Sequence, residues 1–173
     1  MPEPAFFHIS HERFLEEIES LAKALEADSW KPDYLVGIGR GGLAPAVYLS
    51  HRTGLPLLTV DHSTGDHGFG GELLDKLAAK IGSGARILIV DDINDSGATI
   101  NYLRSAIEAK TSEPEGLRVA VLVHNIRSQA RAEYHGSEID RAVDKRWYVF
   151  PWEAVAPAAA LARDAQAVPE RLA

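Results

Sequence analysis

The segment from Ile87 to Thr99, ILIVDDINDSGAT, has the residue pattern with the clearest chemical meaning in the chain. Four aliphatic residues precede the adjacent acids Asp91 and Asp92, and a further acid, a hydroxyl and a glycine then lead into a helical pattern. Backbone N–H groups at the start of a helix can bind a phosphate, and the Ser96 and Thr99 hydroxyls add donors. Carboxylates beside that phosphate could accept hydrogen bonds from two sugar hydroxyls or hold Mg²⁺. The pattern predicts a site for a ribose 5-phosphate.

The same residues have a simpler interpretation, in which the acids only cap a turn and the serine only caps a helix. A lone pair of aspartates would favour that interpretation. The complete thirteen-residue pattern favours ligand binding instead.

Two further segments rich in glycine follow apolar runs. Gly-Arg-Gly-Gly at 39–42 follows the run at 34–39 and precedes a helical segment that ends at Gly54. The sequence DHSTGDHGFGGE at 61–72 has almost no aliphatic residues, so we expect it to form a mobile loop.

The elements that must position these segments follow from the spacing of apolar residues. Residues 11–27 have helical spacing behind Ser10, a good N-cap residue. Continuous apolar runs predict strands, and the segments between them predict helices. We expect strands at 34–39, 55–60, 86–92, 117–124 and near 147–150, and helices at 43–54, 72–81, 99–110 and in the alanine-rich segment after Pro151.

Apolar strands that alternate with helices are typical of parallel strands buried on both faces. The predicted fold class is therefore α/β, an open, doubly wound and mostly parallel sheet. Such sheets bind ligands at the carboxyl ends of their strands, where the loops at 39–42, 61–72 and 91–99 should meet.

Composition narrows the classes of function. The 173 residues are enough for one domain with a full core, and the formal net charge of −7 argues against a nucleic-acid partner. The chain has no cysteine, which excludes disulfides, thiol catalysis and zinc-thiolate sites. We find no signal-peptide pattern and no membrane-spanning run, and we expect a cytoplasmic protein.

Together, these motifs resemble the type I phosphoribosyltransferases, whose 5-phosphoribosyl 1-diphosphate (PRPP) motif is matched by DDINDSGAT at 91–99. The resemblance extends to GIGRGGLAP at 37–45, which is similar to the family's pyrophosphate loop. WYVFPWE at 147–153 is similar to the base-binding segment of the bacterial xanthine-guanine and hypoxanthine branch. The resemblance implies a single domain over 1–173, with a core at about 30–125, a small base-binding hood segment at about 124–153 and helical ends.

The resemblance also implies roles for the residues of the PRPP site. Asp91 and Asp92 would hold the ribose hydroxyls, with Asp92 nearest to a Mg²⁺ cofactor. Asp95 would take part in proton transfer at the purine, which works best if its surroundings raise its pKa. The 5-phosphate would bind Ser96, Gly97, Ala98 and Thr99, and pyrophosphate would bind Arg40, Gly41 and Gly42. The family often has a strained cis peptide here, and we predict one at Gly39–Arg40.

The implied base site lies near the end of the chain. Trp147 matches the aromatic residue that stacks on the purine, and the backbone of Tyr148 would read the ring edge. Glu153 would lie near the base or a second metal. Where the family commonly has a lysine for the purine 6-oxygen, this chain has His124, which could donate or accept a hydrogen bond. The alternatives are that Trp147 belongs to a core strand and that His124 only caps a strand.

The expected function is purine salvage: transfer of ribose 5-phosphate from PRPP to hypoxanthine, guanine or xanthine, with release of pyrophosphate. The family implies a homo-oligomer, either a dimer or a tetramer. The mobile loop differs from the family, since it has Ser-Thr-Gly at 63–65 where Ser-Tyr is common.

Other functions stay open at this point. The altered loop and the missing lysine leave a non-catalytic PRPP-sensing regulator, or a phosphoribosyltransferase for another nucleobase. Gly37, Gly39 and Gly42 also satisfy the dinucleotide pattern G-x-G-x-x-G, with Asp61 about twenty residues on. That pattern ignores residues 91–99 and is the weaker interpretation. The acids and histidines at 61, 62, 66 and 67 are interpreted as a solvated loop rather than a metal cluster.

Overall fold

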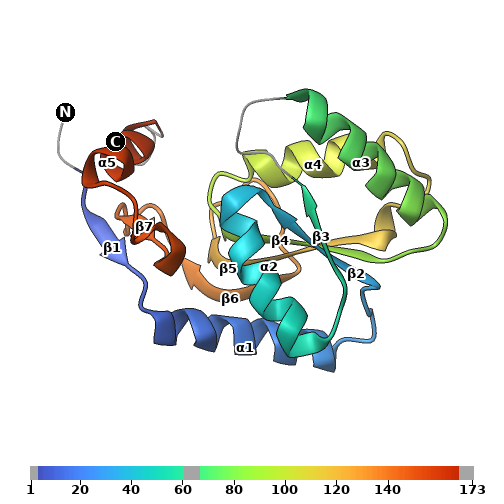
Figure 1. The fold of residues 1–173 in the computed structure, drawn as a ribbon, viewed down its shortest axis with the longest axis horizontal. Coiled ribbons are helices and arrows are strands. Elements are labelled where there is room, and N and C mark those ends of the chain that lie inside the picture. Colours follow the sequence, from blue (N-terminus) through green and yellow to red (C-terminus); the bar gives the residue numbers. More distant parts are fainter. Residues whose placement is uncertain (1–3, 61–66, 168–173) are drawn as a thin grey trace.

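A computed structural model describes residues 4–60 and 67–167, and Figure 1 shows the order of its elements. Five parallel strands form the main sheet in the order β3-β2-β4-β5-β6, and β1 pairs with β7 in a separate parallel pair. The strands are β1 (Phe6–His8), β2 (Tyr34–Ile38), β3 (Leu57–Val60), β4 (Ile87–Asn94), β5 (Leu117–Asn125), β6 (Tyr134–Ile139) and β7 (Trp147–Val149). The helices are α1 (His11–Ala27), α2 (Gly39–Thr53), α3 (His67–Gly82), α4 (Ala98–Glu108) and α5 (Ala158–Gln166), with short 3₁₀ turns η1 (Pro114–Gly116) and η2 (Pro151–Glu153).

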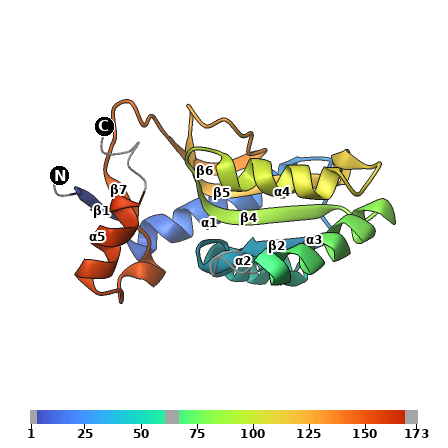
Figure 2. The ribbon, with the colours of Figure 1, turned by 90° about the horizontal axis from the view of Figure 1, so that it is seen from above.

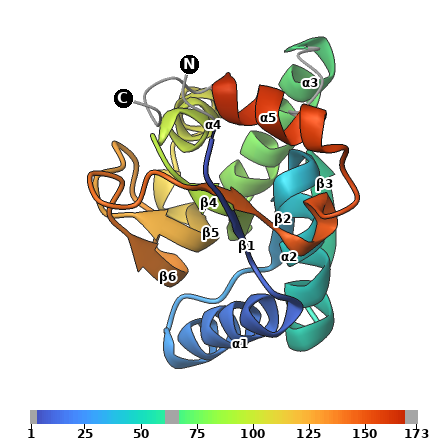
Figure 3. The same cartoon turned by 90° about the vertical axis from the view of Figure 1, so that its left-hand side faces the viewer.

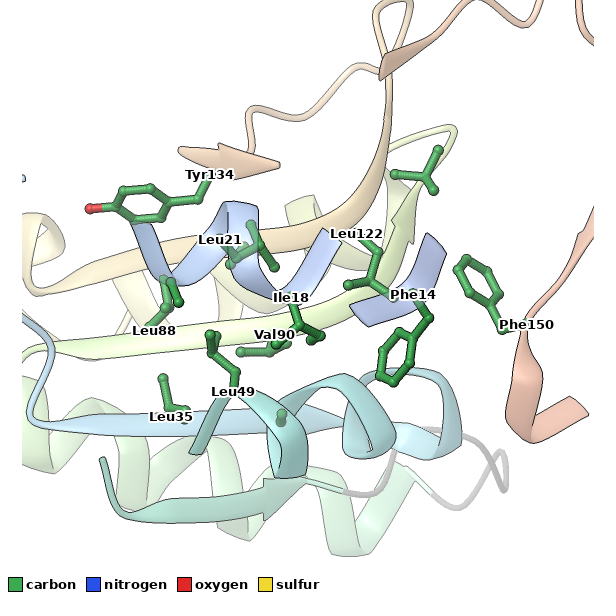
Figure 4. Packing of buried hydrophobic residues seen from close by; sticks show 14 of the residues in the cluster. Phe14, Ile18, Leu21, Leu35, Leu49, Leu88, Val90, Leu122, Tyr134 and Phe150 are labelled. Atoms are coloured by element: carbon green, nitrogen blue, oxygen red, sulfur yellow. The ribbon is translucent and has the colours of Figure 1, made fainter. Parts of the chain in front are cut away.

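Helices cover both faces of the main sheet, which confirms the predicted α/β class (Figure 3). On one face α1 and α2 pack against the sheet, and Figure 4 shows Ile18 of α1 and Leu49 of α2 beside Val90 of β4. On the other face α3 and α4 contribute side chains such as Leu77 and Leu103 to a second buried cluster. Because helices cover both faces of the sheet, a ligand cannot bind on either face. Sheets of this kind bind ligands at the carboxyl ends of their strands, so we look for the site there.

A small layer, which we call the hood, lies at one end of the sheet and consists of β1, β7, η2 and α5 (Figure 2). Its two strands come from opposite ends of the described chain, with Phe6 opposite Trp147. Aromatic side chains join it to α1, because the Trp152 ring lies 5.4 Å from that of Phe14 and 5.0 Å from that of Phe150. The hood is therefore fixed to the core by ring packing.

Most predicted elements are confirmed within a few residues. Helix α1 spans the predicted 11–27, and the Ser10 hydroxyl accepts a hydrogen bond from the Arg13 N–H at 3.1 Å. Helix α2 ends at Thr53, and the predicted end residue Gly54 is its C-cap, with a φ of 74°. The predicted strand near Trp147 exists as β7, where it pairs with β1 outside the main sheet. None of the helices described for this chain is long and apolar enough to span a membrane.

Two predictions about glycine-rich segments are wrong. Residues 67–71 of the predicted mobile loop belong to α3, because the helix buries Leu74, Leu77 and Ile81 and this burial outweighs the low helix propensity of glycine. The rest of that segment, 61–66, lies outside the described residues, as do the acids and the histidine considered there as metal ligands.

The predicted cis peptide at Gly39–Arg40 is also absent, since every peptide bond between described residues is trans. Gly39 makes the turn instead, with a φ of 56° that residues other than glycine rarely adopt. Helix α2 consequently begins at Gly39, earlier than the predicted residue 43.

Candidate functional site

The first wall of the site is the amino end of α2, which lies unusually close to the carboxyl end of β4. A Cβ atom on Gly42 would lie 2.2 Å from the Val90 carbonyl oxygen, and one on Gly41 would lie 2.4 Å from Asp92 Oδ2. At Gly42 a side chain would meet the backbone of β4, and at Gly41 it would displace the Asp92 carboxylate. The two glycines therefore let the free N–H groups of this helix lie beside the acids of β4 with the Asp92 carboxylate in its present place.

Asp91 and Asp92 lie at the end of β4, as the sequence predicts. The Asp92 N–H donates to Asp91 Oδ1 at 3.0 Å, and the Ile93 N–H donates to Asp92 Oδ1 at 2.7 Å. Burial, together with the neighbouring charge of Asp92, raises the pKa of the Asp91 carboxyl group. Because two adjacent negative charges are unfavourable in a buried place, this pair of carboxylates suits a bound divalent cation or the hydroxyls of a sugar.

The loop after β4 forms a second wall. Gly97 has a φ of 89°, and a Cβ there would lie 2.5 Å from the Ala130 nitrogen. The Ala98 N–H donates to the Ser96 hydroxyl at 3.3 Å, and α4 begins at Ala98. A hollow of about 370 Å³ is lined by residues 91–100 and Ala167. Its position at the amino end of α4 suits a phosphate group.

Asp95 is the first residue of the same loop, and the side chains of Arg141 and Asn125 hold it in place. Arg141 Nε lies 3.2 Å from Oδ1 and 3.1 Å from Oδ2, and its side chain is only 9% exposed. Asn125 Nδ2 donates to the Asp95 carbonyl oxygen at 3.0 Å. The predicted proton-transfer residue is thus held in one orientation.

A cavity of about 930 Å³ separates the acids of β4 from the hood. The core wall includes Arg40, Gly41 and Thr99, and the hood wall includes Glu153 and Arg163. Burial raises the pKa of the Glu153 carboxyl group, and Glu153 Oε2 accepts a hydrogen bond from the Phe150 N–H at 2.9 Å. The cavity places the predicted pyrophosphate loop opposite the predicted base-binding segment.

Comparison with known proteins decides the family. A family model described as a phosphoribosyl transferase domain matches residues 9–157. The chain belongs to the phosphoribosyl transferase domain family. It is 36% identical over 121 residues to a xanthine-guanine phosphoribosyltransferase of a Ruegeria species, and 29% identical over 119 residues to one of Roseobacter denitrificans. Each of these alignments covers 61% of this chain and 66% of the relative, so the chain spans just under two thirds of their length.

Solved structures support the same fold. A purine phosphoribosyltransferase from Pyrococcus horikoshii is 25% identical with a TM-score of 0.62, over 87% of this chain and 95% of that one. A protein from Neisseria gonorrhoeae with bound ppGpp is 21% identical with a TM-score of 0.66, over 96% and 98% of the two chains. The phosphoribosyl transferase assignment argues against the dinucleotide interpretation of Gly37–Gly42.

Within this phosphoribosyl transferase domain, the base-binding candidates lie in three places, of which η2 with Glu153 has been described above. Trp147 and Tyr148 are in β7, and the Tyr148 ring is buried with its hydroxyl donating to Asp144 Oδ2 at 2.8 Å. The carbonyl before Trp147, that of Arg146, accepts from Arg141 Nη1 at 2.7 Å. Arg141 therefore connects the Trp147 segment to Asp95.

His124 lies at the end of β5, and its neighbours select one tautomer. Asn94 Nδ2 donates to the Ala130 carbonyl at 2.8 Å and lies 3.1 Å from His124 Nδ1. Burial, and then the His135 ring stacked 5.3 Å away, lowers the pKa of His124. Because Nδ1 faces a donor, the proton of the neutral ring is on Nε2, which leaves Nε2 as a hydrogen-bond donor.

Sequence reasoning located the acids, the phosphate loop and the glycine turn, and the structure brings these together around one cavity and its adjoining hollow. It missed Arg141, Asn125 and Arg163. Nothing local distinguishes these residues, because Arg141 lies 46 positions from Asp95 in the chain. The signal that identifies Arg141 is its burial beside Asp95, and this burial is visible only once the fold is known.

Proposed function

We propose that this chain is a Mg²⁺-dependent purine phosphoribosyltransferase that transfers ribose 5-phosphate from PRPP to a 6-oxopurine and releases pyrophosphate. The observation that carries the proposal is the contact of Gly41 and Gly42 with the end of β4. This contact brings the helix end that we propose for the diphosphate close to the two carboxylates that we propose for the ribose. Both line one cavity, and the loop that we propose for the 5-phosphate lines the adjoining hollow. The xanthine-guanine relatives support the choice of a purine as the acceptor.

The mechanism follows from this arrangement. Backbone N–H groups and hydroxyls at 96–99 bind the 5-phosphate, and Asp91 and Asp92 accept hydrogen bonds from the ribose hydroxyls. Arg40 and the N–H groups of the α2 end bind the diphosphate. A base nitrogen forms a bond to the anomeric carbon while the bond from that carbon to the diphosphate oxygen breaks.

The carboxylate of Asp95 acts as a general base and takes the proton that the purine loses. Asp92, beside Asp91, would hold Mg²⁺, which would offset the charge of the diphosphate when bound. The fit rests on the two adjacent carboxylates at the end of β4, where burial already disfavours uncompensated negative charge. The Nε2–H of His124 would donate to the purine 6-oxygen in place of the usual lysine.

The test is pyrophosphate release from PRPP and Mg²⁺, measured with hypoxanthine, guanine, xanthine, adenine, uracil and orotate one at a time. Release with 6-oxopurines alone supports the proposal. Release only with adenine or a pyrimidine keeps the mechanism and overturns the choice of base.

A non-catalytic PRPP-sensing regulator is the second candidate, and it is favoured by two observations. The Asp95 carboxylate is already engaged by Arg141, and His124 stands in place of the family's lysine. PRPP that raises the melting temperature, with no pyrophosphate release for any base, would favour the regulator.

Replacing Trp147 with alanine should raise the KM for the base by about tenfold and leave the KM for PRPP within about twofold. The reason is that the indole would supply stacking area to the base alone. Steady-state kinetics with guanine and PRPP varied in turn measures both constants. Val143→Ala is the control, since Val143 is 82% exposed and does not line the cavity between β4 and the hood. An unchanged KM for the base would remove Trp147 from the base site.

We also propose a homo-oligomer, a dimer or tetramer, that acts in the cytoplasm on PRPP and a purine base. Light scattering coupled to size-exclusion chromatography measures the assembly, and a monomeric mass across the working concentrations would contradict it.

A further inference from the structure

Arg141 lies almost fully covered between the phosphate loop and the hood. Its Nε and Nη2 face the Asp95 carboxylate, with Nη2 3.0 Å from Oδ2. Its Nη1 donates to two carbonyl oxygens, those of Asp144 at 3.1 Å and Arg146 at 2.7 Å. The planar guanidinium therefore contacts an acid on one side and the start of the hood strand on the other.

The surrounding groups fix this guanidinium from further directions. Its carbon lies 5.0 Å from the centre of the Tyr148 ring, and the Tyr148 hydroxyl is held by Asp144. Asn125 completes the arrangement, because its Oδ1 accepts from the Arg141 N–H at 3.3 Å while its Nδ2 donates to the Asp95 carbonyl. Arg141 and Asp95 are thus joined through both side chain and backbone.

Most ion pairs described in this structure have a different character. Asp140, the residue before Arg141, pairs with Arg127, whose side chain is 60% exposed. Ion pairs that are this exposed contribute little to the free energy of unfolding. In the Arg141–Asp95 pair the two side chains are 9% and 12% exposed, respectively. The pair links two parts of the chain that have different roles in the proposed reaction. One part carries the proton acceptor, and the other carries the strand of Trp147.

We propose that Arg141 is a positioning residue that acts through Asp95, and that it sets the place of this carboxylate relative to the base platform in β7. The proposal rests on the proposed function. A lysine could retain the charge, but it could not contact the carboxylate and both carbonyls at once, because it lacks the planar fork. Misplacement of a reacting group by about 1 Å costs on the order of 100-fold in rate.

The experiment is a double-mutant cycle between Arg141→Gln and Asp95→Asn, with kcat, both KM values and the melting temperature measured for each variant. Arg104→Gln is the matched control. Arg104 pairs with Glu133, the two side chains are 19% and 12% exposed, and Glu133 lies next to Val119 near the amino end of β5, away from the site. Arg141→Lys tests whether charge alone is sufficient.

We expect Arg141→Gln to lower kcat by about 100-fold with the KM for PRPP within about twofold, and Arg141→Lys to lower it by about tenfold. In the Asp95→Asn background, Arg141→Gln should lower kcat by less than about threefold, because its effect passes through a carboxylate that is already gone. Arg104→Gln should lower the melting temperature about as much as Arg141→Gln, with kcat within about twofold of wild type.

An equal loss of kcat from Arg141→Gln in both backgrounds would overturn the proposal, as would a kcat no lower than that of Arg104→Gln. These outcomes leave the proposed function intact, because the wild-type chain would still turn over. A wild-type chain that releases no pyrophosphate with any base would instead remove the proposed function, and the role of Arg141 with it.

Discussion

Replacing Asp95 with asparagine is expected to lower kcat by about 10² to 10⁴-fold while PRPP binds almost as before. Loss of a general base lowers the rate by this much, because the purine must then lose its proton to water instead of to the Asp95 carboxylate. Asparagine keeps the size of the side chain and an oxygen that can face Arg141 Nε. The groups that would hold the 5-phosphate, the N–H groups and hydroxyls at 96–99, are unchanged.

The measurement is kcat from initial rates with saturating guanine and PRPP, together with the Kd of PRPP by calorimetry. Asp75→Asn is the control, since Asp75 is in the middle of α3, pairs with Lys110 on the surface and lines neither the cavity nor the hollow. Equal losses in turnover and in PRPP affinity would show that Asp95 supports ligand binding and not proton transfer. Melting temperatures separate either result from partial unfolding, which the unpaired Arg141 could promote.

Alanine at Gly41 or Gly42 is expected to lower PRPP affinity by about 100-fold or more, for two different steric reasons. At Gly42 the added methyl group meets the Val90 carbonyl at 2.2 Å, so backbone must move. At Gly41 it meets the Asp92 carboxylate at 2.4 Å, so a side chain proposed to bind ligand must turn away. We expect Gly42→Ala to lower the free energy of unfolding as well, by about 1–3 kcal/mol.

Calorimetric titration with PRPP and Mg²⁺, with denaturant unfolding in parallel, measures both effects. Gly71→Ala is a suitable control, because Gly71 lies in α3 and a Cβ there meets nothing within 4 Å. Alanine should leave that helix as stable or more stable, since it is the better helix former. An unchanged PRPP affinity in the Gly41→Ala variant would show that the amino end of α2 does not bind the diphosphate.

The main sheet could be predicted because its strands are buried on both faces. Runs such as Ile87–Val90 and Val119–Val123 are continuous in apolar residues, and this signal is local. Strand β6 is different. It lies at the sheet edge, and its sequence YHGSEI has one glycine and three polar residues, which no apolar period marks.

Strand β1 and the beginning of α3 were missed for a related reason. Phe6–His8 is three residues long and becomes a strand only because β7 lies beside it. Gly68, Gly70 and Gly71 read as loop residues, but the apolar face that continues beyond them from Leu74 decides the helix. In both cases tertiary contacts override a local preference.

The candidate site divides in the same way. Asp91, Asp92, Ser96 and Thr99 are contiguous in sequence, so their pattern is readable before any fold is known. The residues that hold Asp95 come from the end of β5 and the turn after β6, and their meeting depends on the order of strands. Side chains that hold a candidate site residue in place from distant parts of the chain are thus the part least visible in a single sequence.

The pairing of β1 with β7 has a consequence for synthesis of the chain. Strand β1 is synthesised before its partner β7, which lies roughly 140 positions later, so this pairing closes one of the longest loops among the described residues. The sheet can assemble as its strands emerge, whereas the hood must wait for β7. Phe6 and Phe7 therefore have no strand partner until β7 is made, and the two hood strands pair only after the strands of the main sheet have been synthesised.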